Sequence, residues 1–213
     1  FEEFIKLFQN VSVIDSAMLA AFGKSRNYHA LQLTRWVNEG KLIQLRRGCY
    51  VIAPPYQKTP ASPYLIANTL RHPSYVSLQS ALAEYGVIPE AAPVVTSVTT
   101  GRPGEWGTPA GTFRYHHVRR ELFFVYTNRV TTKQPVLVAT PEKAILDLIY
   151  LLDRPVSPEW IEEMRFQNMR RFNGRRLTGF ARRFDDGQIR KAVRLFLEYR
   201  QKWAQEFAEV SLV

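Results

Sequence analysis

The sequence contains a single cysteine, Cys49, and only four histidines among 213 residues. One cysteine excludes an intramolecular disulfide, and scattered histidines without a second cysteine do not make a structural zinc site. Cys49 lies in an apolar, strand-like run, where we expect a small buried hydrophobic residue. We therefore expect a protein of a reducing compartment that uses neither a metal nor another cofactor.

Long apolar runs are also missing. No stretch of about 18 apolar residues is present, which excludes a membrane-spanning helix. The first residues lack the basic, apolar and small-residue pattern of a signal peptide, a weak indication in a chain that begins at Phe1 rather than at methionine. A hydrophobic content of 46% and an aromatic content of 13% favour a folded core. We expect a soluble, cytoplasmic protein with no membrane partner.

Acidic residues are scarce at both ends of the chain. The net charge is +10, of which residues 1–56 contribute +3, residues 57–164 contribute zero and residues 165–213 contribute +7. Two basic ends favour a polyanionic partner, with nucleic acid ahead of an anionic membrane surface. The plain alternative is that the arginines only keep helices solvated.

The N-terminal part predicts three short helices followed by a hairpin. The helices are expected over "FEEFIKLFQN", "AMLAAF" and residues 26–39, with Gly23 and Gly40 after the second and third. The runs "KLIQL" and "CYVIA" read as two strands joined by Arg46, Arg47 and Gly48. This order is that of a winged helix-turn-helix, so residues 1–56 are predicted to form a DNA-binding domain whose wing carries cations to phosphates.

One face of the third helix has the residue types that read DNA. At 100° per residue, Ala30, Leu33 and Val37 face the core, while Leu31 lies on the opposite, polar side, where it contacts a thymine methyl group or another domain. Glutamine and arginine have bidentate matches to adenine and guanine, and a helix N-terminus favours a phosphate. The plain alternative is a solvated polar face. The predicted DNA-binding residues are Ser25, Arg26, Asn27, Tyr28, Gln32, Arg35, Arg46 and Arg47.

The rest of the chain predicts a linker, residues 57–62, and a second domain, residues 63–213, of the α+β class. Ser62 and Thr140 are expected to cap helices that open with proline. Strands are expected at "PVVTSVTT", "GTFRYHHV", "FFVYT" and "PVLVAT", forming a small, mainly antiparallel sheet. Further helices are expected from Ser157 to about Phe172 and from about Gln188 to Ala208.

The common catalytic motifs are absent, including phosphate-binding loops, zinc-protease helices and nucleophile elbows. Glu142, Lys143 and Asp147 resemble part of a nuclease set, but they follow a helix cap, so we expect them to face solvent and the helix dipole. "TTGRP", residues 99–103, reads as a strand-to-loop transition rather than a phosphate-binding turn. The sequence therefore predicts a protein that is not an enzyme.

The tail from residue 165 interleaves arginines with phenylalanines. Such interleaving suits single-stranded nucleic acid, but the phenylalanines recur at helical spacing and are expected in the core. An outward arginine surface remains for DNA phosphates or for an acidic partner. Its predicted residues are Arg170, Arg171, Arg175, Arg176, Arg182 and Arg183.

Four stretches, taken in order, resemble the AbiEi family of antitoxins from type IV toxin-antitoxin systems. The resemblance covers roughly residues 12–152, and its stretches are "LTRWVNEGKLIQLRRGCYVI", "SPYLIANTLRHPSYVSLQSALAEYGVIPE", "VTTGRP" and "ATPEKAILDLIYL".

The resemblance implies a bacterial antitoxin, linked to abortive infection by phage, that represses its own operon. Its winged helix would bind inverted repeats in the promoter through the DNA-binding residues given above, as a monomer or weak dimer that binds cooperatively. Its C-terminal domain would antagonise a nucleotidyltransferase toxin without forming a stable complex, and the arginine surface of the tail is the expected antitoxic surface.

Two other functions stay open from the sequence. One is a DNA-processing nuclease with an unrecognised site, and the other is an RNA-binding module that uses the arginine-rich tail.

Overall fold

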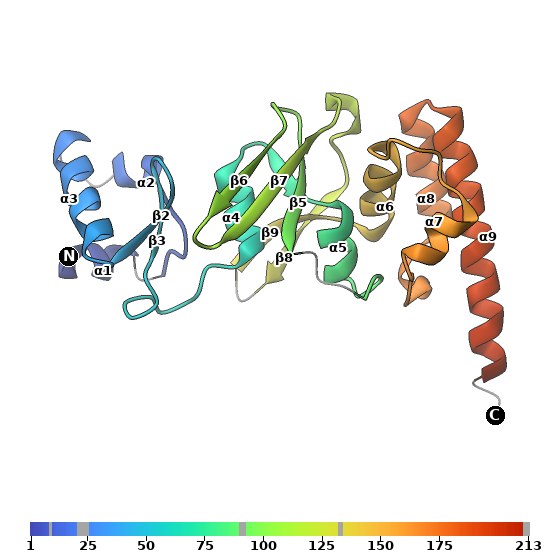
Figure 1. Ribbon diagram of the computed structural model, residues 1–213, viewed down its shortest axis with the longest axis horizontal. Helices are drawn as coiled ribbons and strands as arrows, with labels where there is room; N and C mark the ends of the chain where they lie inside the picture. Colours follow the sequence, from blue (N-terminus) through green and yellow to red (C-terminus); the bar gives the residue numbers. More distant parts are fainter. Residues whose placement is uncertain (9, 21–25, 90–92, 132–133, 211–213) are drawn as a thin grey trace.

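The computed structural model describes residues 1–8, 10–20, 26–89, 93–131 and 134–210. Its elements follow one another along the long axis of the molecule, with α3 at one end and α9 at the other (Figure 1). The N-terminal elements are α1 (Glu2–Phe8), β1 (Ile14–Asp15), α2 (Ser16–Ala20), α3 (Arg26–Asn38), β2 (Leu42–Arg46) and β3 (Cys49–Ile52). The three helices followed by a hairpin were predicted, whereas the short strand β1 was not.

The strands β1, β3 and β2 form an antiparallel sheet, which we call the small sheet. Its side chains alternate between two cores, because successive residues of a strand point to opposite faces. Tyr50 and Ile52 pack with α1 and α3 in an N-terminal core, while Cys49 and Val51 pack in the larger core of the rest of the chain. Cys49 is fully buried, as predicted. The small sheet is thus packed on both faces.

The central part is a mixed sheet, which we call the large sheet, with α4 (Pro63–Leu70) and α5 (Leu78–Glu84) packed against it. In the described ranges its strand order is β6-β7-β5-β4-β9-β8. The strands are β4 (Ser74–Val76), β5 (Val94–Thr99), β6 (Gly104–Thr108), β7 (Gly111–His117), β8 (Tyr126–Thr131) and β9 (Gln134–Ala139), with a 3-10 turn, η1 (Arg120–Leu122), before β8.

The structure confirms the α+β class, and the sheet of the second part is mainly antiparallel, as expected, although it also contains parallel pairs. The pairs β4-β5, β6-β7 and β8-β9 are antiparallel. The pairs β4-β9 and β5-β7 are parallel, so the sheet is mixed. The strand β6 lies in "GRPGEWGTPAG". The glycines and prolines of this stretch are typical of a turn rather than of a strand. The predicted strand "FFVYT" begins only at Tyr126, after η1.

The C-terminal part is helical and consists of α6 (Pro141–Tyr150), α7 (Pro158–Glu163), η2 (Met169–Arg171), α8 (Gly174–Ala181), η3 (Arg182–Phe184) and α9 (Gly187–Val210). The helix predicted from Ser157 to Phe172 ends at Glu163, because Arg165 and Asn168 take left-handed backbone angles, with φ of 51° and 50°. The last helix is confirmed. Ser62 and Thr140 cap α4 and α6 as predicted.

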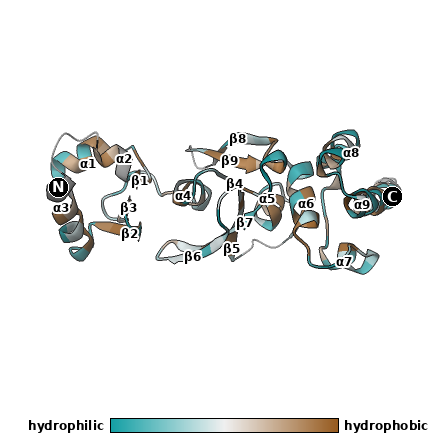
Figure 2. Ribbon diagram, turned by 90° about the horizontal axis from the view of Figure 1, so that it is seen from above, coloured by the Kyte–Doolittle hydropathy of each residue, from teal (hydrophilic) through white to brown (hydrophobic). Residues whose placement is uncertain are grey.

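Helix α6 connects the large sheet to the helical end. It lies between α5 and the pair α8 and α9 in two perpendicular views (Figures 1 and 2), and it contacts all three. Every residue from Glu142 to Ile149 is buried. A helix covered on all sides needs partners for any charge that it carries.

Candidate nucleic-acid interface

Helix α3 is held to the N-terminal core by one apolar side. Leu33 is buried, and Trp36 and Val37 pack against the same core. The helix ends where Gly40 adopts a φ of +68° and Lys41 N donates to Trp36 O at 2.8 Å, a conformation that favours glycine. These contacts fix which side of α3 faces outward.

The outward side of α3 carries Leu31, Thr34 and Arg35, all of them exposed. Gln32 lies at its edge and is half-buried. Ala30 was predicted to face the core but is exposed, because the apolar stripe is centred on Leu33, Trp36 and Val37.

The other DNA-binding residues predicted on this helix lie at its N-terminus. Ser25 lies outside the described residues. Arg26, Asn27 and Tyr28 belong to the first turn of α3.

Arg35 is oriented by an acidic neighbour. Its Nε lies 2.7 Å from Glu39 Oε1, while Lys41 Nζ lies 2.7 Å from Glu39 Oε2. The hydrogen bonds from Lys41 and Arg35 lower the pKa of Glu39, so this carboxylate stays ionised at neutral pH. Because Glu39 contacts Nε, the two terminal nitrogens of Arg35 are available for a fork of hydrogen bonds to a guanine or a phosphate.

The hairpin carries both predicted wing arginines on the surface. Arg46 is the last residue of β2 and pairs with Cys49 of β3. The turn consists of Arg47 and Gly48, and Gly48 has a φ of +77°. Both arginine side chains are exposed. Arg46 therefore lies at a strand end and Arg47 at the tip. The strand β2 also contacts β6, which holds the hairpin against one edge of the large sheet.

The predicted arginine surface divides into two groups. Arg176 and Arg183 lie over aromatic rings, with Arg183 Cζ 3.9 Å from the centroid of Phe124. The second group lines hollows around α8 and consists of Arg170, Arg171, Arg175 and Arg182. The sequence reasoning missed Arg190, Arg194 and Arg200, which line the same hollows. The i, i+4 spacing of Arg190 and Arg194 on α9 was the available signal.

Most of the phenylalanines among these arginines are core residues, as predicted, whereas Phe180 is half-buried. Phe166, Phe172 and Phe184 are buried, and the rings of Phe166 and Phe172 pack against Phe196 of α9. Buried rings offer no stacking surface to nucleotide bases.

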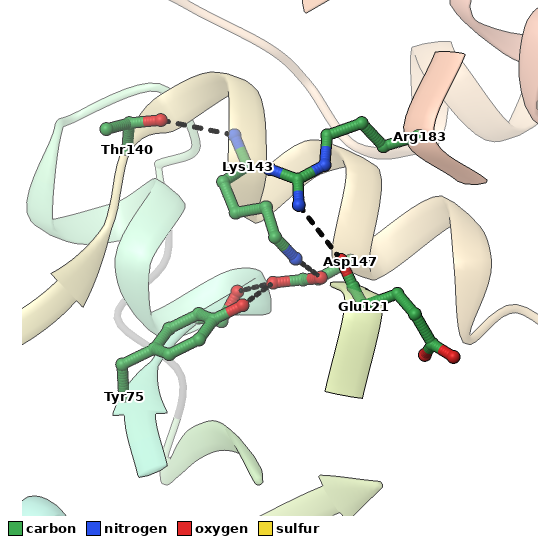
Figure 3. Close-up of polar contacts among 7 residues, drawn as sticks. Tyr75, Glu121, Thr140, Lys143, Asp147 and Arg183 are labelled. Carbon is green, nitrogen blue, oxygen red and sulfur yellow. Dashed lines mark hydrogen bonds and ion pairs between the residues drawn. The ribbon is translucent and has the colours of Figure 1, made fainter. Parts of the chain in front are cut away.

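A buried ion pair on α6 corrects the expectation that Lys143 and Asp147 face solvent. Both side chains are fully buried, and Lys143 Nζ contacts Asp147 Oδ1 (Figure 3). Asp147 Oδ2 accepts hydrogen bonds from Tyr75 Oη at 3.1 Å and Ser77 Oγ at 2.7 Å. Glu142, also expected to face solvent, is buried and accepts from Asn173 N at 2.9 Å.

Aromatic rings complete the surroundings of Lys143. Its Nζ lies 5.0 Å from the ring centroid of Phe124 and 5.4 Å from that of Phe184. Burial lowers the pKa of Lys143 and raises that of Asp147, and the contact between the two groups acts against both shifts. A fully buried pair offers no surface to a substrate, so the geometry fits a structural role.

The turn at residues 99–103 uses its polar groups internally. Gly101 N donates to Thr99 Oγ1 at 3.0 Å, and His117 Nδ1 lies 3.0 Å from Gly101 O. This agrees with the strand-to-loop interpretation.

The described residues contain no group of three or more histidine, cysteine, aspartate or glutamate side chains that could hold a metal ion. None of the described helices is long and apolar enough to cross a membrane.

Comparison with known families gives a match to the N-terminal part alone. Residues 3–53 match a family of transcriptional regulators. The family is described as "Transcriptional regulator, AbiEi antitoxin", which confirms the resemblance predicted from the sequence over this segment. The segment spans α1 to β3, including the exposed side of α3 and the hairpin. No curated protein matched the chain.

Proposed function

We propose that this protein is a DNA-binding transcriptional repressor of its own operon and the antitoxin of a type IV toxin-antitoxin system. The observation that carries the proposal is the outward side of α3, with the oriented Arg35, beside an arginine-bearing hairpin in the segment that matches AbiEi regulators. In this proposal residues 1–56 act as a winged helix-turn-helix. Residues 57–62 are the linker, and residues 63–213 form the antitoxin domain.

In this proposal helix α3 and the hairpin have different roles on DNA. Helix α3 would enter the major groove, where Arg35 and Gln32 contact base edges. Arg46 and Arg47 would contact the phosphate backbone beside it, which positions the helix without reading sequence. The protein acts in the cytoplasm and binds inverted repeats cooperatively, as a monomer or weak dimer.

The antitoxin part of the proposal is supported by the arginine surface of the C-terminal helices. The arginines of α8 and α9 lie at the opposite end of the molecule from α3 (Figure 1), so they belong to a second surface. The proposed antagonism is directed at a nucleotidyltransferase toxin and needs no stable complex. The protein does not act as an enzyme.

A mobility-shift titration tests the repressor role. The whole protein is titrated against the DNA upstream of its gene and against a shuffled duplex of equal length, at two salt concentrations. We expect tight, selective shifts on the upstream DNA, weakening steeply as salt rises because phosphate contacts release counterions. Equal shifts on both duplexes would contradict the proposal and leave only a generic basic surface.

Leu31 is expected to add an apolar base contact. Its side chain is 74% exposed on α3, one turn before the exposed Thr34 and Arg35, which suits van der Waals contact with a thymine methyl group. Replacing one operator thymine by deoxyuridine removes that methyl alone. We expect a sensitive thymine in each half-site, with a loss of about 0.5–1 kcal/mol for the wild type and none for Leu31→Ala. A scan in which no thymine distinguishes the two proteins would exclude this contact.

A further inference from the structure

The surface between α8 and α9 is hollowed along its length. Two adjoining hollows, of about 540 and 390 Å³, share Thr178, Arg182 and Leu197 in their walls. We call this surface the α8-α9 groove. It lies at the end of the molecule opposite α3 (Figure 1).

The floor of the groove is apolar, and its α8 side carries residues without a side chain. Ala181 and Val193 are buried there and Leu197 is half-buried. Gly174 and Gly179 stand on the α8 side, and a Cβ added at Gly179 would meet nothing within 4 Å. Small residues along one helix let another backbone approach closely.

Arginines surround this apolar floor. Arg175 and Arg182 come from the α8 side, and Arg190 and Arg194 come from α9. None of the four forms an ion pair with another residue in the part of the chain that the structure describes. Glu198 is the acidic residue in the walls. The groove therefore combines an apolar floor with four arginines that have no carboxylate partner among the described residues.

We propose that the α8-α9 groove binds an acidic amphipathic helix of a protein partner. Leucine-like side chains of that helix occupy the floor, and flanking carboxylates accept forked hydrogen bonds from the arginines. The eight residues of α8 span about 12 Å, which matches two to three turns of a bound helix. A phosphate backbone uses the arginines but gains nothing from Val193 and Leu197, which favours protein over nucleic acid.

This inference goes beyond the proposed function, in which the antagonism of the toxin needs no stable complex. Its test does not involve operator DNA. A mobility shift on operator DNA with the same variants reports on the repressor role separately, because α3 lies at the other end of the molecule.

The experiment measures anisotropy of a fluorescent peptide with the full-length protein. The probe is a helix of about three turns, with leucines on one face and glutamates beside them. The comparison peptide has the same composition with its leucines spread around the helix. We expect the segregated peptide to bind at least about tenfold more tightly than its isomer.

Matched variants locate the binding site. We expect Arg182→Glu with Arg194→Glu to weaken peptide binding about tenfold or more, and Gly179→Trp to block the groove. Gly179→Ala adds only a methyl group in open space, and Arg102→Glu reverses an exposed arginine between β5 and β6 of the large sheet, so both are expected to bind normally. Circular dichroism of each variant verifies that it is folded.

Three outcomes would overturn the inference. These are no binding of the segregated peptide, equal binding of the two peptides, and binding that is unchanged in the Gly179→Trp and arginine variants. Displacement of the peptide by random duplex DNA, with the same dependence on Arg182 and Arg194, would instead make the groove a phosphate surface.

Discussion

Replacing Asp147 by leucine is expected to lower the free energy of unfolding by about 3–5 kcal/mol, the usual cost of removing one partner of a buried ion pair. Leucine fills a similar volume, so the loss comes from electrostatics rather than from a cavity. The change leaves the Lys143 ammonium without its carboxylate in an environment of aromatic rings. It also leaves the buried hydroxyls of Tyr75 and Ser77 without their acceptor.

The partner variant, Lys143→Met, is expected to cost less, about 2–3 kcal/mol, because Asp147 keeps two hydrogen-bond donors. The buried carboxyl can also take up a proton. Burial already raises the pKa of Asp147, and Lys143 opposes that shift, so removing Lys143 raises the pKa further. When folding raises the pKa of a carboxyl, the free energy of unfolding falls as the pH rises above the pKa that this carboxyl has in the unfolded chain. The cost of Lys143→Met should therefore be larger at about pH 8 than at about pH 5.

Equilibrium unfolding in urea measures both effects as shifts in midpoint at constant slope. The double variant should cost less than the sum of the two single variants, because it leaves no isolated charge. Glu163→Leu is the control, since it breaks the exposed ion pair with Arg154 and should change stability by about 0.5 kcal/mol or less. Single variants that behave like this control would show that Lys143 and Asp147 are not a buried pair.

The charged residues of α6 were predicted to face solvent but are buried. Its apolar residues form one helical stripe, which favours a helix with one solvated face. The structure packs α5, α8 and α9 around the helix and supplies partners for its charges from elements far away in the chain, such as Ser77, 70 residues before Asp147. A local pattern does not contain that information, so the helix and its Thr140 cap were predictable but its burial was not.

The same distinction applies to the sheets. The hairpin of β2 and β3 was predictable because a glycine turn joins two neighbouring apolar runs. The parallel pairs β4-β9 and β5-β7 join strands that are separated by other elements, and their order depends on how the whole sheet packs. The arginines of α8 were visible as a basic stretch, but the groove that they share with Arg190 and Arg194 requires the packing of two helices.

The second large effect is expected at Arg35, where replacement by alanine should weaken operator binding by about 1–3 kcal/mol and relax specificity at one base pair. The reason is geometric: Glu39 holds Arg35 Nε, so the guanidinium is oriented before DNA arrives. Arg46→Ala should instead weaken operator and shuffled duplex alike and lower the salt slope by about one, because a phosphate contact carries no sequence information.

Mobility-shift titrations of both variants on both duplexes separate these roles. Arg154→Ala is the matched control, since it removes an exposed arginine that also pairs with a glutamate, Glu163, but lies between α6 and α7. Equal losses on operator and shuffled DNA for Arg35→Ala would exclude a base contact and assign Arg35 to the backbone. A further variant, Glu39→Gln, keeps the charge of Arg35 but loosens its orientation. An intermediate loss for Glu39→Gln, confined to operator DNA, would show that the ion pair contributes to recognition by holding the arginine in place.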